Sequence, residues 1–431
     1  DLHSFPTRRS SDLWQKTKNY CCYLVAATAF FAVSCKKENP DIPQNLPDPI
    51  QIELRASEQQ ILESDGAFAF DFFGRVFEAE AADKDANFMV SPLSLTIALA
   101  MTWNGSAGET KTAMEQTLKW DGYSDEDING YYKKLKEALL KTDSSTKLSI
   151  ANSIWTQKGR NIRPDFIGTN TDYYQSVVES VDFSDPNTVK RINQWACDHT
   201  NGLIKEVLPS TSADALMYLL NAIYFKGIWT SRFDAKHTRE MPFVREDGTR
   251  DKAQMMQQSE EFNYTENETM QVVQLPYGNQ AFSMLVMLPK EGKRLQDAVT
   301  LLGNKDAWKN VRIALSKAKV DLFLPKFKTE YSKILNEVLK DMGMEIAFTG
   351  AADFSRMSDV ASFISFVKQD TYISTDELGT EAAAVTVVEM VTSMPTVPQT
   401  VTFKADHPFI YLIQENSTGA ILFMGAVKHF K

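Results

Sequence analysis

The hydrophobic period changes along the body of this 431-residue chain, and this change limits the folds that it can adopt. In the first third, apolar residues recur near the 3.6-residue spacing of a helix with one buried face; they are Ala67, Phe68, Phe70, Phe72, Phe73, Val76 and Phe77. Ser91 followed by Pro92 is typical of a helix start, with Ser91 as the N-cap and Pro92 in the first turn. Another helix is expected over residues 131–140.

Later segments are short apolar or alternating runs bounded by Gly, Pro, Asn or Asp, which is typical of strands. These runs cover residues 148–155, 216–225, 270–275, 282–288, 320–324 and 420–425. We therefore predict an α+β fold, with helices first and strands mostly after them. Residues 57–431 contain no second linker, low-complexity tract or internal repeat, which indicates one domain.

Three segments precede this domain. Residues 1–13 show no apolar period and are expected to be a non-native leader or an artefact. Residues 14–35 resemble a bacterial lipoprotein signal, because the apolar run over 21–33 is shorter than the roughly 20 residues of a membrane-spanning helix. Cys35 would then be the lipidated first residue, and an ordinary secretory signal is the alternative. Residues 36–56 carry four prolines among polar residues, which is typical of an extended linker.

Charge and composition exclude several classes of function. The formal net charge of −10, without a basic cluster, argues against a nucleic-acid partner. The cysteines are Cys21, Cys22, Cys35 and Cys197, and their spacing supports neither a zinc site nor a disulfide framework. Cys197 is expected to be an unreactive, half-buried thiol. No hydrolase elbow, zinc-protease motif or phosphate-binding loop occurs, so we expect no catalytic residue, metal or cofactor, and a hydrolase remains an unsupported alternative.

The segment over residues 376–398 reads DELGTEAAAVTVVEMVTSMPTVP and has an unusual alternation. One register is uncharged, and it comprises Thr380, Ala382, Ala384, Thr386, Val388 and Met390. Both carboxylates, on Glu381 and Glu389, fall in the other register. Because strand side chains alternate between faces, this segment could enter a sheet with the first register against a core and both carboxylates toward solvent. A permanent strand is the simpler alternative, although small residues are poor strand formers.

The same segment resembles the hinge of inhibitory serpins, in which Gly, Thr or Ser, Glu and a run of Ala begin a mobile reactive-centre loop. The hinge residues are Glu377, Leu378, Gly379, Thr380, Glu381, Ala382, Ala383 and Ala384. Further motifs of this family match in order along the chain: NFMVSPLS at 87–94, NAIYFKGIW at 221–229, and DHPFIY at 406–411. The resemblance covers residues 57–431, and it implies three β-sheets, about nine helices and an exposed loop outside a five-stranded central sheet.

The resemblance also implies a region where the central sheet opens. Its residues in this chain are Ser91, Ser94, Asn221, Trp229, Lys326 and Gln369. Gln369 stands where the family usually has histidine, so a pH-sensitive opening through that residue is in doubt because an amide does not titrate. Glu377 and Lys326 occupy the positions of a hinge salt bridge, which if exposed would contribute only about 0–1 kcal/mol.

By this resemblance the chain is expected to inhibit a protease once, by trapping it as an acyl-enzyme while the cut loop inserts into the sheet. Counting from Glu377 places the cut between Ser393 and Met394; bonds after Thr392 or Met390 are alternatives. A cut before Pro395 is disfavoured because the proline ring constrains the leaving side. The small Ser393 suits elastase-like or subtilisin-like serine proteases, and papain-like cysteine proteases are further candidates.

The runner-up hypothesis is a non-inhibitory serpin that acts as a chaperone, carrier or structural binding protein. A charged, bulky or proline-containing hinge would favour it, and none of these occurs from Gly379 to Ala384. We expect an exported monomer that meets a membrane only through a lipid anchor. It would be an outer-membrane or cell-surface lipoprotein of a bacterium, or otherwise extracellular or periplasmic.

Lipidation at Cys35 is directly testable. In a bacterial host fed a palmitate analogue, the chain should incorporate label, because the apolar run and the polar segment after it direct export and anchoring. The Cys35→Ala variant should lose the label. Label that persists in this variant would contradict the assignment.

Overall fold

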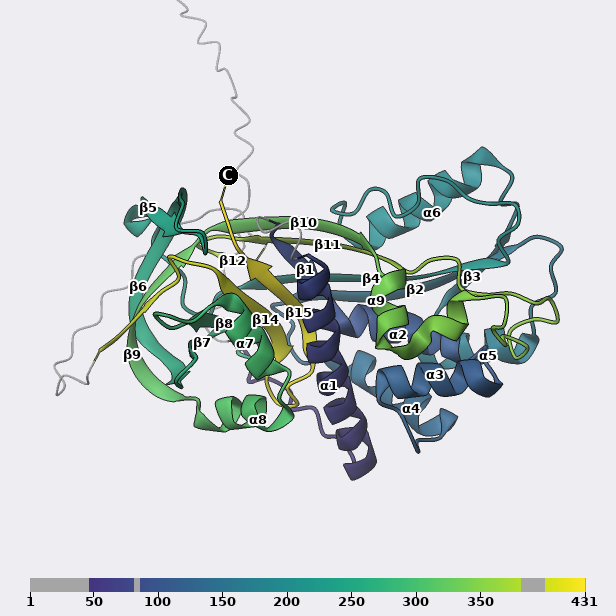
Figure 1. Cartoon of the computed structure of the whole chain (residues 1–431), viewed down its shortest axis with the longest axis horizontal. Helices are drawn as coiled ribbons and strands as arrows, with labels where there is room; N and C mark the ends of the chain where they lie inside the picture. The colour runs from purple at the N-terminus through teal and green to yellow at the C-terminus, as the bar shows by residue number, and fades with distance from the viewer. Residues whose placement is uncertain (1–45, 81–85, 381–399, 431) are drawn as a thin grey trace, which may run out of the picture. The chain divides into compact units, whose positions relative to one another are not determined.

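Strands and helices alternate through residues 46–80, 86–380 and 400–430, which are the residues that the computed structural model describes (Figure 1). The predicted α+β class is confirmed. The order of elements is more mixed than predicted, because strands already follow the helices of the first third. The helices in these residues are α1 (Ala56–Ala79), α2 (Pro92–Trp103), α3 (Gly108–Leu118), α4 (Asp125–Leu139), α5 (Pro164–Tyr174), α6 (Pro186–His199), α7 (Leu295–Leu302), α8 (Lys305–Ala314) and α9 (Asn336–Leu339), with short turns η1 (Ala235–His237), η2 (Lys340–Met344) and η3 (Glu345–Phe348).

The predicted start of the second helix is confirmed. Ser91 has an extended backbone and its side chain accepts a hydrogen bond from the Ser94 amide, while Pro92 occupies the first helical position. The N-cap satisfies one of the amides that a helix start leaves unpaired. The Ser91 cap and Pro92 therefore fix the start of α2. Ser91 also contacts Gln369 on β11, so the start of this helix lies against the second sheet.

Two sheets hold the strands of the described residues. The strands are β1 (Phe88–Val90), β2 (Lys147–Gln157), β3 (Val177–Val181), β4 (Met217–Ile228), β5 (Arg239–Val244), β6 (Arg250–Glu266), β7 (Met270–Tyr277), β8 (Phe282–Pro289), β9 (Ser316–Pro325), β10 (Phe327–Ile334), β11 (Lys368–Thr375), β12 (Gly379–Thr380), β13 (Val401–Lys404), β14 (Phe409–Glu415) and β15 (Ile421–Val427). One sheet has nine strands in the order β1-β15-β14-β8-β7-β6-β9-β13, with β5 paired to β6. The long strand β6 pairs with β5, β9 and β7, which joins two of the three expected sheets into one.

The second sheet has the order β10-β11-β12-β4-β2-β3. Five of its strands have between five and twelve residues and correspond to the expected five-stranded central sheet, and β12 adds two residues between β11 and β4. Gly379 and Thr380 pair with Ile228 and Gly227 on β4, and Thr380 pairs with Thr375 on β11. The first residues of the expected loop therefore already lie in the sheet.

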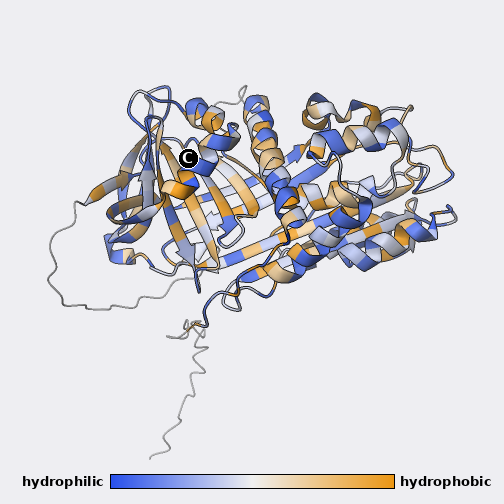
Figure 2. Cartoon of the chain, turned by 90° about the horizontal axis from the view of Figure 1, so that it is seen from below, coloured by the Kyte–Doolittle hydropathy of each residue, from blue (hydrophilic) through white to orange (hydrophobic). Residues whose placement is uncertain are grey.

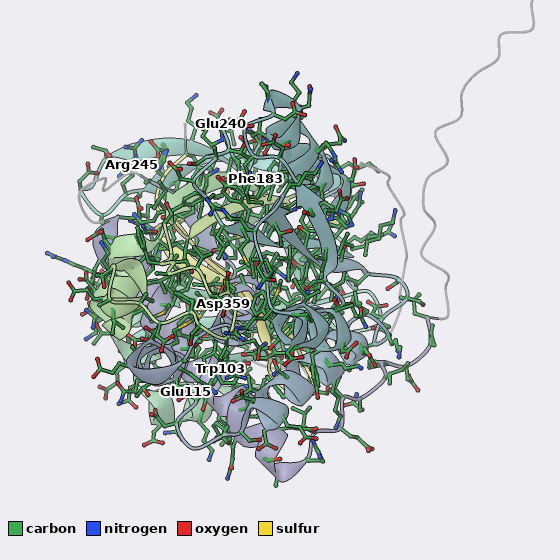
Figure 3. All side chains as sticks on the ribbon, turned by 90° about the vertical axis from the view of Figure 1, so that its right-hand side faces the viewer. Trp103, Glu115, Phe183, Glu240, Arg245 and Asp359 are labelled. Atoms are coloured by element: carbon green, nitrogen blue, oxygen red, sulfur yellow. The ribbon has the colours of Figure 1, made fainter. Side chains whose placement is uncertain are left out.

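Helices cover both faces of this second sheet. Figure 1 shows α6 on one side of β2 and β4, and α2 with α5 on the other. A small apolar cluster of Trp155, Val181, Phe183, Ile192 and Leu208 lies beside α6, while the main core fills the space on the other side. Figure 3 shows Phe183 and Trp103 on these opposite sides. Hydrophobic and hydrophilic segments alternate along the strands in Figure 2, as a sheet with two different faces requires.

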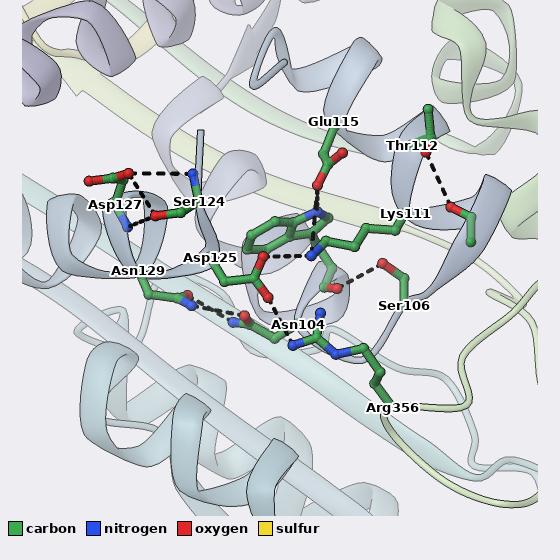
Figure 4. Close-up of polar contacts among 12 residues, drawn as sticks. Asn104, Ser106, Lys111, Thr112, Glu115, Ser124, Asp125, Asp127, Asn129 and Arg356 are labelled. Atoms are coloured by element: carbon green, nitrogen blue, oxygen red, sulfur yellow. Dashed lines mark hydrogen bonds and ion pairs between the residues drawn. The ribbon is translucent and has the colours of Figure 1, made fainter. Parts of the chain in front are cut away.

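The connection over residues 349–367, which leads into β11, is fixed to the helices by charged groups. Arg356 lies 2.8 Å from Asp125, whose other carboxylate oxygen is 2.5 Å from Lys111 (Figure 4). Burial would raise the pKa of Asp125, but hydrogen bonds from Lys111 and Arg356 outweigh it and lower that pKa. Arg163 adds an ion pair to Asp359 at 2.5 Å. These ion pairs fix the connection whose residues 360–367 line a cavity beside β11.

Candidate functional site

A cavity of about 830 Å³ lies between β4 and β11. Both strands are antiparallel to β12 and hence parallel to each other, and within the described residues their facing edges pair only with Gly379 and Thr380. The cavity continues from that point along both edges, and residues 214–225 and 360–373 line it. Unpaired edges on both sides of one cavity form a template for an additional strand.

The turn over residues 376–378, which leads from β11 into β12, lies at the end of the cavity next to Gly379 and is anchored on Trp229. The indole Nε1 donates to the Asp376 carbonyl at 2.9 Å, and the Trp229 amide donates to the Leu378 carbonyl at 2.8 Å. The Phe233 amide donates to the Glu377 carbonyl at 3.0 Å. Trp229 directly follows β4, so these bonds tie residues 376–378 to the end of that strand.

The predicted partners Glu377 and Lys326 are in contact, at 2.8 Å between Oε2 and Nζ. Thr238 donates to the other carboxylate oxygen at 2.8 Å. The Glu377 side chain is only 13 % exposed and that of Lys326 is 39 % exposed, so the pair is more buried than a surface pair. Burial would raise the pKa of Glu377, but the hydrogen bonds from Lys326 and Thr238 help to keep it below its usual value.

Thr380 points into the core and is only 3 % exposed. Its hydroxyl lies 2.6 Å from the hydroxyl of Tyr277, and the ring of Tyr277 stacks on Trp229 with a centroid distance of 4.4 Å. A Cβ on Gly379 would overlap the Gly227 carbonyl, so only glycine fits beside β4 at this point. The expected alternation therefore begins with Thr380 on the core side of the sheet.

Gln369 holds β11 against the start of α2. Its Oε1 accepts from the Ser91 amide at 2.9 Å, and its Nε2 donates to the Ser91 carbonyl at 2.8 Å. The Ser91 hydroxyl donates to the Leu422 carbonyl on β15 at 2.7 Å and also accepts from the Ser94 amide. The structure thus brings the predicted residues Gln369, Ser91 and Ser94 together. The side-chain amide of Gln369 forms two hydrogen bonds with the backbone of Ser91.

Asn221 lies on the opposite wall of the cavity and has different partners. Its Nδ2 donates to Asn152 on β2 at 2.7 Å, and Asn152 donates to the Tyr174 carbonyl at 2.7 Å. The buried Oδ1 of Asn221 has no hydrogen-bond partner among the described residues. Gln369 and Asn221 therefore line the same cavity from opposite walls, and the Asn221 Oδ1 is an acceptor without a hydrogen-bond partner among the described residues.

Several predicted residues fall outside the described part of the chain. They are Glu381, Ala382, Ala383, Ala384, Met390, Thr392, Ser393, Met394 and the proposed lipidation residue Cys35. Cys197 lies on α6 as a half-buried free thiol. None of the described helices is both long and apolar enough to cross a membrane.

Sequence reasoning missed Tyr277, Asn152 and Thr238, which contact Thr380, Asn221 and Glu377. Each comes from a strand or turn far away in the sequence, and each is an ordinary polar residue in a polar-apolar pattern. Only the strand order brings these residues to the cavity, so no local signal could have identified them.

Comparison with known proteins gives the family. The model of "Serpin (serine protease inhibitor)" matches residues 63–429. A leukocyte elastase inhibitor of Xenopus laevis is 34 % identical over 378 residues, which cover 83 % of this chain and 96 % of the relative. The native structure of tengpin, a thermophilic serpin, has a TM-score of 0.78 and 34 % identity, and covers 90 % of this chain and 97 % of that one. Human thyroxine-binding globulin complexed with thyroxine has a TM-score of 0.76 and 28 % identity over 87 % of this chain and 99 % of that one.

The chain belongs to the serpin family. This membership supports protease inhibition as the general activity, because the family is one of serine protease inhibitors. The fold similarity extends to a relative whose structure holds thyroxine, so the fold alone does not choose between protease inhibition and ligand binding.

The hinge contact of Glu377 predicts a pH dependence of stability. Since its folded pKa lies below the ordinary value of 4.5, the folded state binds fewer protons than the unfolded chain in that range. The contribution is therefore complete above about pH 5 and is lost as pH falls through the folded pKa. We expect Glu377→Gln to lower the free energy of unfolding by about 1 kcal/mol or less at pH 7, and by less at pH 3.5. Denaturant unfolding across this range measures it, and a difference that does not change with pH would contradict it.

Proposed function

We propose that this chain is a single-use protease inhibitor whose reactive loop, once cut, inserts residues 381–393 as a strand between β4 and β11. The protease nucleophile attacks the loop carbonyl and forms an acyl-enzyme. Insertion then carries the attached protease away before water can release it. The inhibitor supplies the strand and the cavity, and it supplies no catalytic group.

The register of β12 carries this proposal. Thr380 lies opposite Gly227 on β4 and opposite Thr375 on β11. In an antiparallel ladder, each step forward on one strand is a step back on its neighbour. In the proposed inserted strand, Thr386, six residues after Thr380, would therefore come between Asn221 and Gln369. The polar residue of the inserted face thus meets the polar pair of the cavity, where the free Asn221 Oδ1 can accept from the threonine hydroxyl.

The remaining residues of that face meet mostly apolar walls in the same register. They are small or apolar, and the pairs that flank them are Phe225 and Ile373 for Ala382, Ile223 and Thr371 for Ala384, and Leu219 and Val367 for Val388. The side chains along both edges are lining residues of the cavity. This agreement between loop and walls favours insertion over a loop that stays outside the sheet.

The length of the cavity supports a cut after Ser393. In the continued register, residues 382–393 run along residues 225–214 of one wall and 373–362 of the other, and both ranges line the cavity. A strand of about a dozen residues adds on the order of 10 kcal/mol through hydrogen bonds, at roughly 0.5–1.5 kcal/mol each. Cuts after Thr392 or Met390 would give shorter strands.

The proposed targets are elastase-like or subtilisin-like serine proteases, with papain-like cysteine proteases as further candidates. Ser393 offers a small side chain to a shallow specificity pocket and no cation to a trypsin-like one. A relative named leukocyte elastase inhibitor, 34 % identical, supports the first class. We propose that the inhibitor acts as an exported monomer anchored through Cys35.

A non-inhibitory role as carrier or binding protein is the competing proposal. Thyroxine-binding globulin has a similar fold, so only the hinge and the cavity can distinguish the two roles. Small uncharged residues at 382–384 and the matched cavity walls favour an inserting loop. Formation of a covalent complex with a protease that survives boiling in SDS would decide for inhibition, and cleavage without a complex would decide against it.

Thr380→Arg tests the inserted face. The arginine would bring an unpaired charge to the position of a side chain that is 3 % exposed, which costs several kcal/mol. We expect the variant to be cut as a substrate, with the covalent complex reduced by roughly tenfold or more. Thr380→Ser keeps the hydroxyl at Tyr277 and should trap the protease as the parent does. Equal trapping by Thr380→Arg would contradict the proposal.

Mass spectrometry of the C-terminal fragment released on cleavage locates the reactive bond. A fragment that begins at Met394 is expected, because a strand that ends at Ser393 would run along cavity-lining residues over its whole length. A fragment that begins upstream of Val391 would overturn the placement.

A further inference from the structure

We propose that Lys136 on α4 is a positioning residue for the cavity, which acts through the Tyr174 carbonyl and Asn152 to hold Asn221 on the β4 wall. This inference rests on the proposed function and adds a contact, outside the hinge and the cavity, on which trapping depends. The four residues come from α4, α5, β2 and β4, so the connection crosses from the helical side of the molecule into the second sheet.

The Tyr174 carbonyl is the centre of this connection. Tyr174 is the last residue of α5, and Gln175 after it has a left-handed backbone with φ of 53°. The last carbonyls of a helix have no partner within the helix. The Tyr174 carbonyl accepts instead from Lys136 Nζ at 3.0 Å and from Asn152 Nδ2 at 2.7 Å. One carbonyl therefore joins α4 and β2 to the end of α5.

Lys136 is buried, with an exposed fraction of only 6 %. Burial of a cation is costly. It lowers the pKa of the Lys136 amine, and Glu137, the next residue on α4, only partly offsets this. Carbonyls at a helix C-terminus carry partial negative charge and stabilise a nearby cation. The end of α5 therefore compensates the amine for the loss of water, and the amine in turn holds the end of α5.

The Tyr174 carbonyl also fixes the orientation of two side-chain amides. Because a carbonyl can only accept, Asn152 has to direct Nδ2 toward Tyr174 and Oδ1 toward β4. The Asn152 Oδ1 then accepts from Asn221 Nδ2 at 2.7 Å. This leaves Asn221, a residue that lines the cavity, with Oδ1 as its unpartnered atom among the described residues. The polarity of the β4 wall at Asn221 is thus determined at the end of α5.

The hydroxyl of Tyr174 is held separately. It donates to Asn129 Oδ1 at 2.7 Å, and Asn129 and Asn104 exchange two side-chain hydrogen bonds of 2.9 Å each (Figure 4). These bonds fix the ring of Tyr174, whereas the bond from Lys136 fixes its carbonyl. Loss of the Lys136 amine should therefore affect Asn152 and Asn221 without releasing the ring.

A double-mutant cycle between Lys136→Met and Asn221→Ala tests the connection in the uncut full chain. Methionine keeps an unbranched side chain and removes the donor. Lys134→Met is the matched control, because Lys134 lies on the same helix and its Nζ pairs with Glu58 at 2.6 Å. We expect the guanidinium unfolding midpoint of the Lys136–Asn221 double variant to miss additivity by about 0.1–0.3 M, and that of the Lys134–Asn221 double variant to be additive.

The stoichiometry of inhibition is the second readout, measured as the number of inhibitor molecules consumed for each elastase or subtilisin molecule trapped. A β4 wall that is less firmly held should receive the loop more slowly, so that more protease is released before it is trapped. We expect Lys136→Met to raise this number about twofold or more, with an unchanged rate of first encounter with the protease. Lys134→Met should leave the number as in the parent.

Each outcome decides the proposal. Additive midpoints for Lys136→Met and Asn221→Ala would overturn it, because the lysine would then not act on Asn221. Coupled midpoints with a stoichiometry like that of the parent would overturn the positioning role, because the contact would then serve stability alone. If the parent traps neither protease, the proposed function fails and the role in trapping fails with it, while the unfolding cycle still decides whether Lys136 holds Asn221.

Discussion

Two parallel strand edges that face each other without pairing are the feature on which the site depends. Below Gly379 and Thr380, the described residues leave the edges of β4 and β11 with a cavity of about 830 Å³ between them. Backbone groups along such edges lack the ladder partners that a central position in a sheet normally gives. A segment of the same chain that begins in register between these edges would satisfy them, and the hinge begins there.

The contacts around the cavity divide into those that anchor the hinge and those that hold the walls. Trp229 and the Glu377 pair anchor the turn at the upper end. Gln369 ties one wall to α2 through the backbone of Ser91, and Asn221 ties the other to β2. Because neither amide titrates, these wall contacts do not change with pH, unlike the carboxylate at the hinge. The two wall contacts therefore depend on hydrogen-bond geometry more than on protonation.

Local patterns in the sequence predicted the fold class, the start of α2 and the core side of Thr380, because caps and strand alternation are encoded within a few residues. The extent of β6 was missed because its 17 residues are largely polar, and its pairing on several sides joined two expected sheets. Tyr277 and Asn152 were missed for another reason. Their role depends on strand order, which non-local pairing decides. The burial of Glu377 likewise required the turn against Trp229 to be known.

The most direct test of the account is a crystal structure of the chain after a single cut in the loop. The account predicts a new strand between β4 and β11, in the register that brings Thr386 between Asn221 and Gln369, with its hydroxyl within hydrogen-bond distance of Asn221 Oδ1. A cavity that remains empty after cleavage, or a strand in a register that brings a different residue to Asn221, would contradict it.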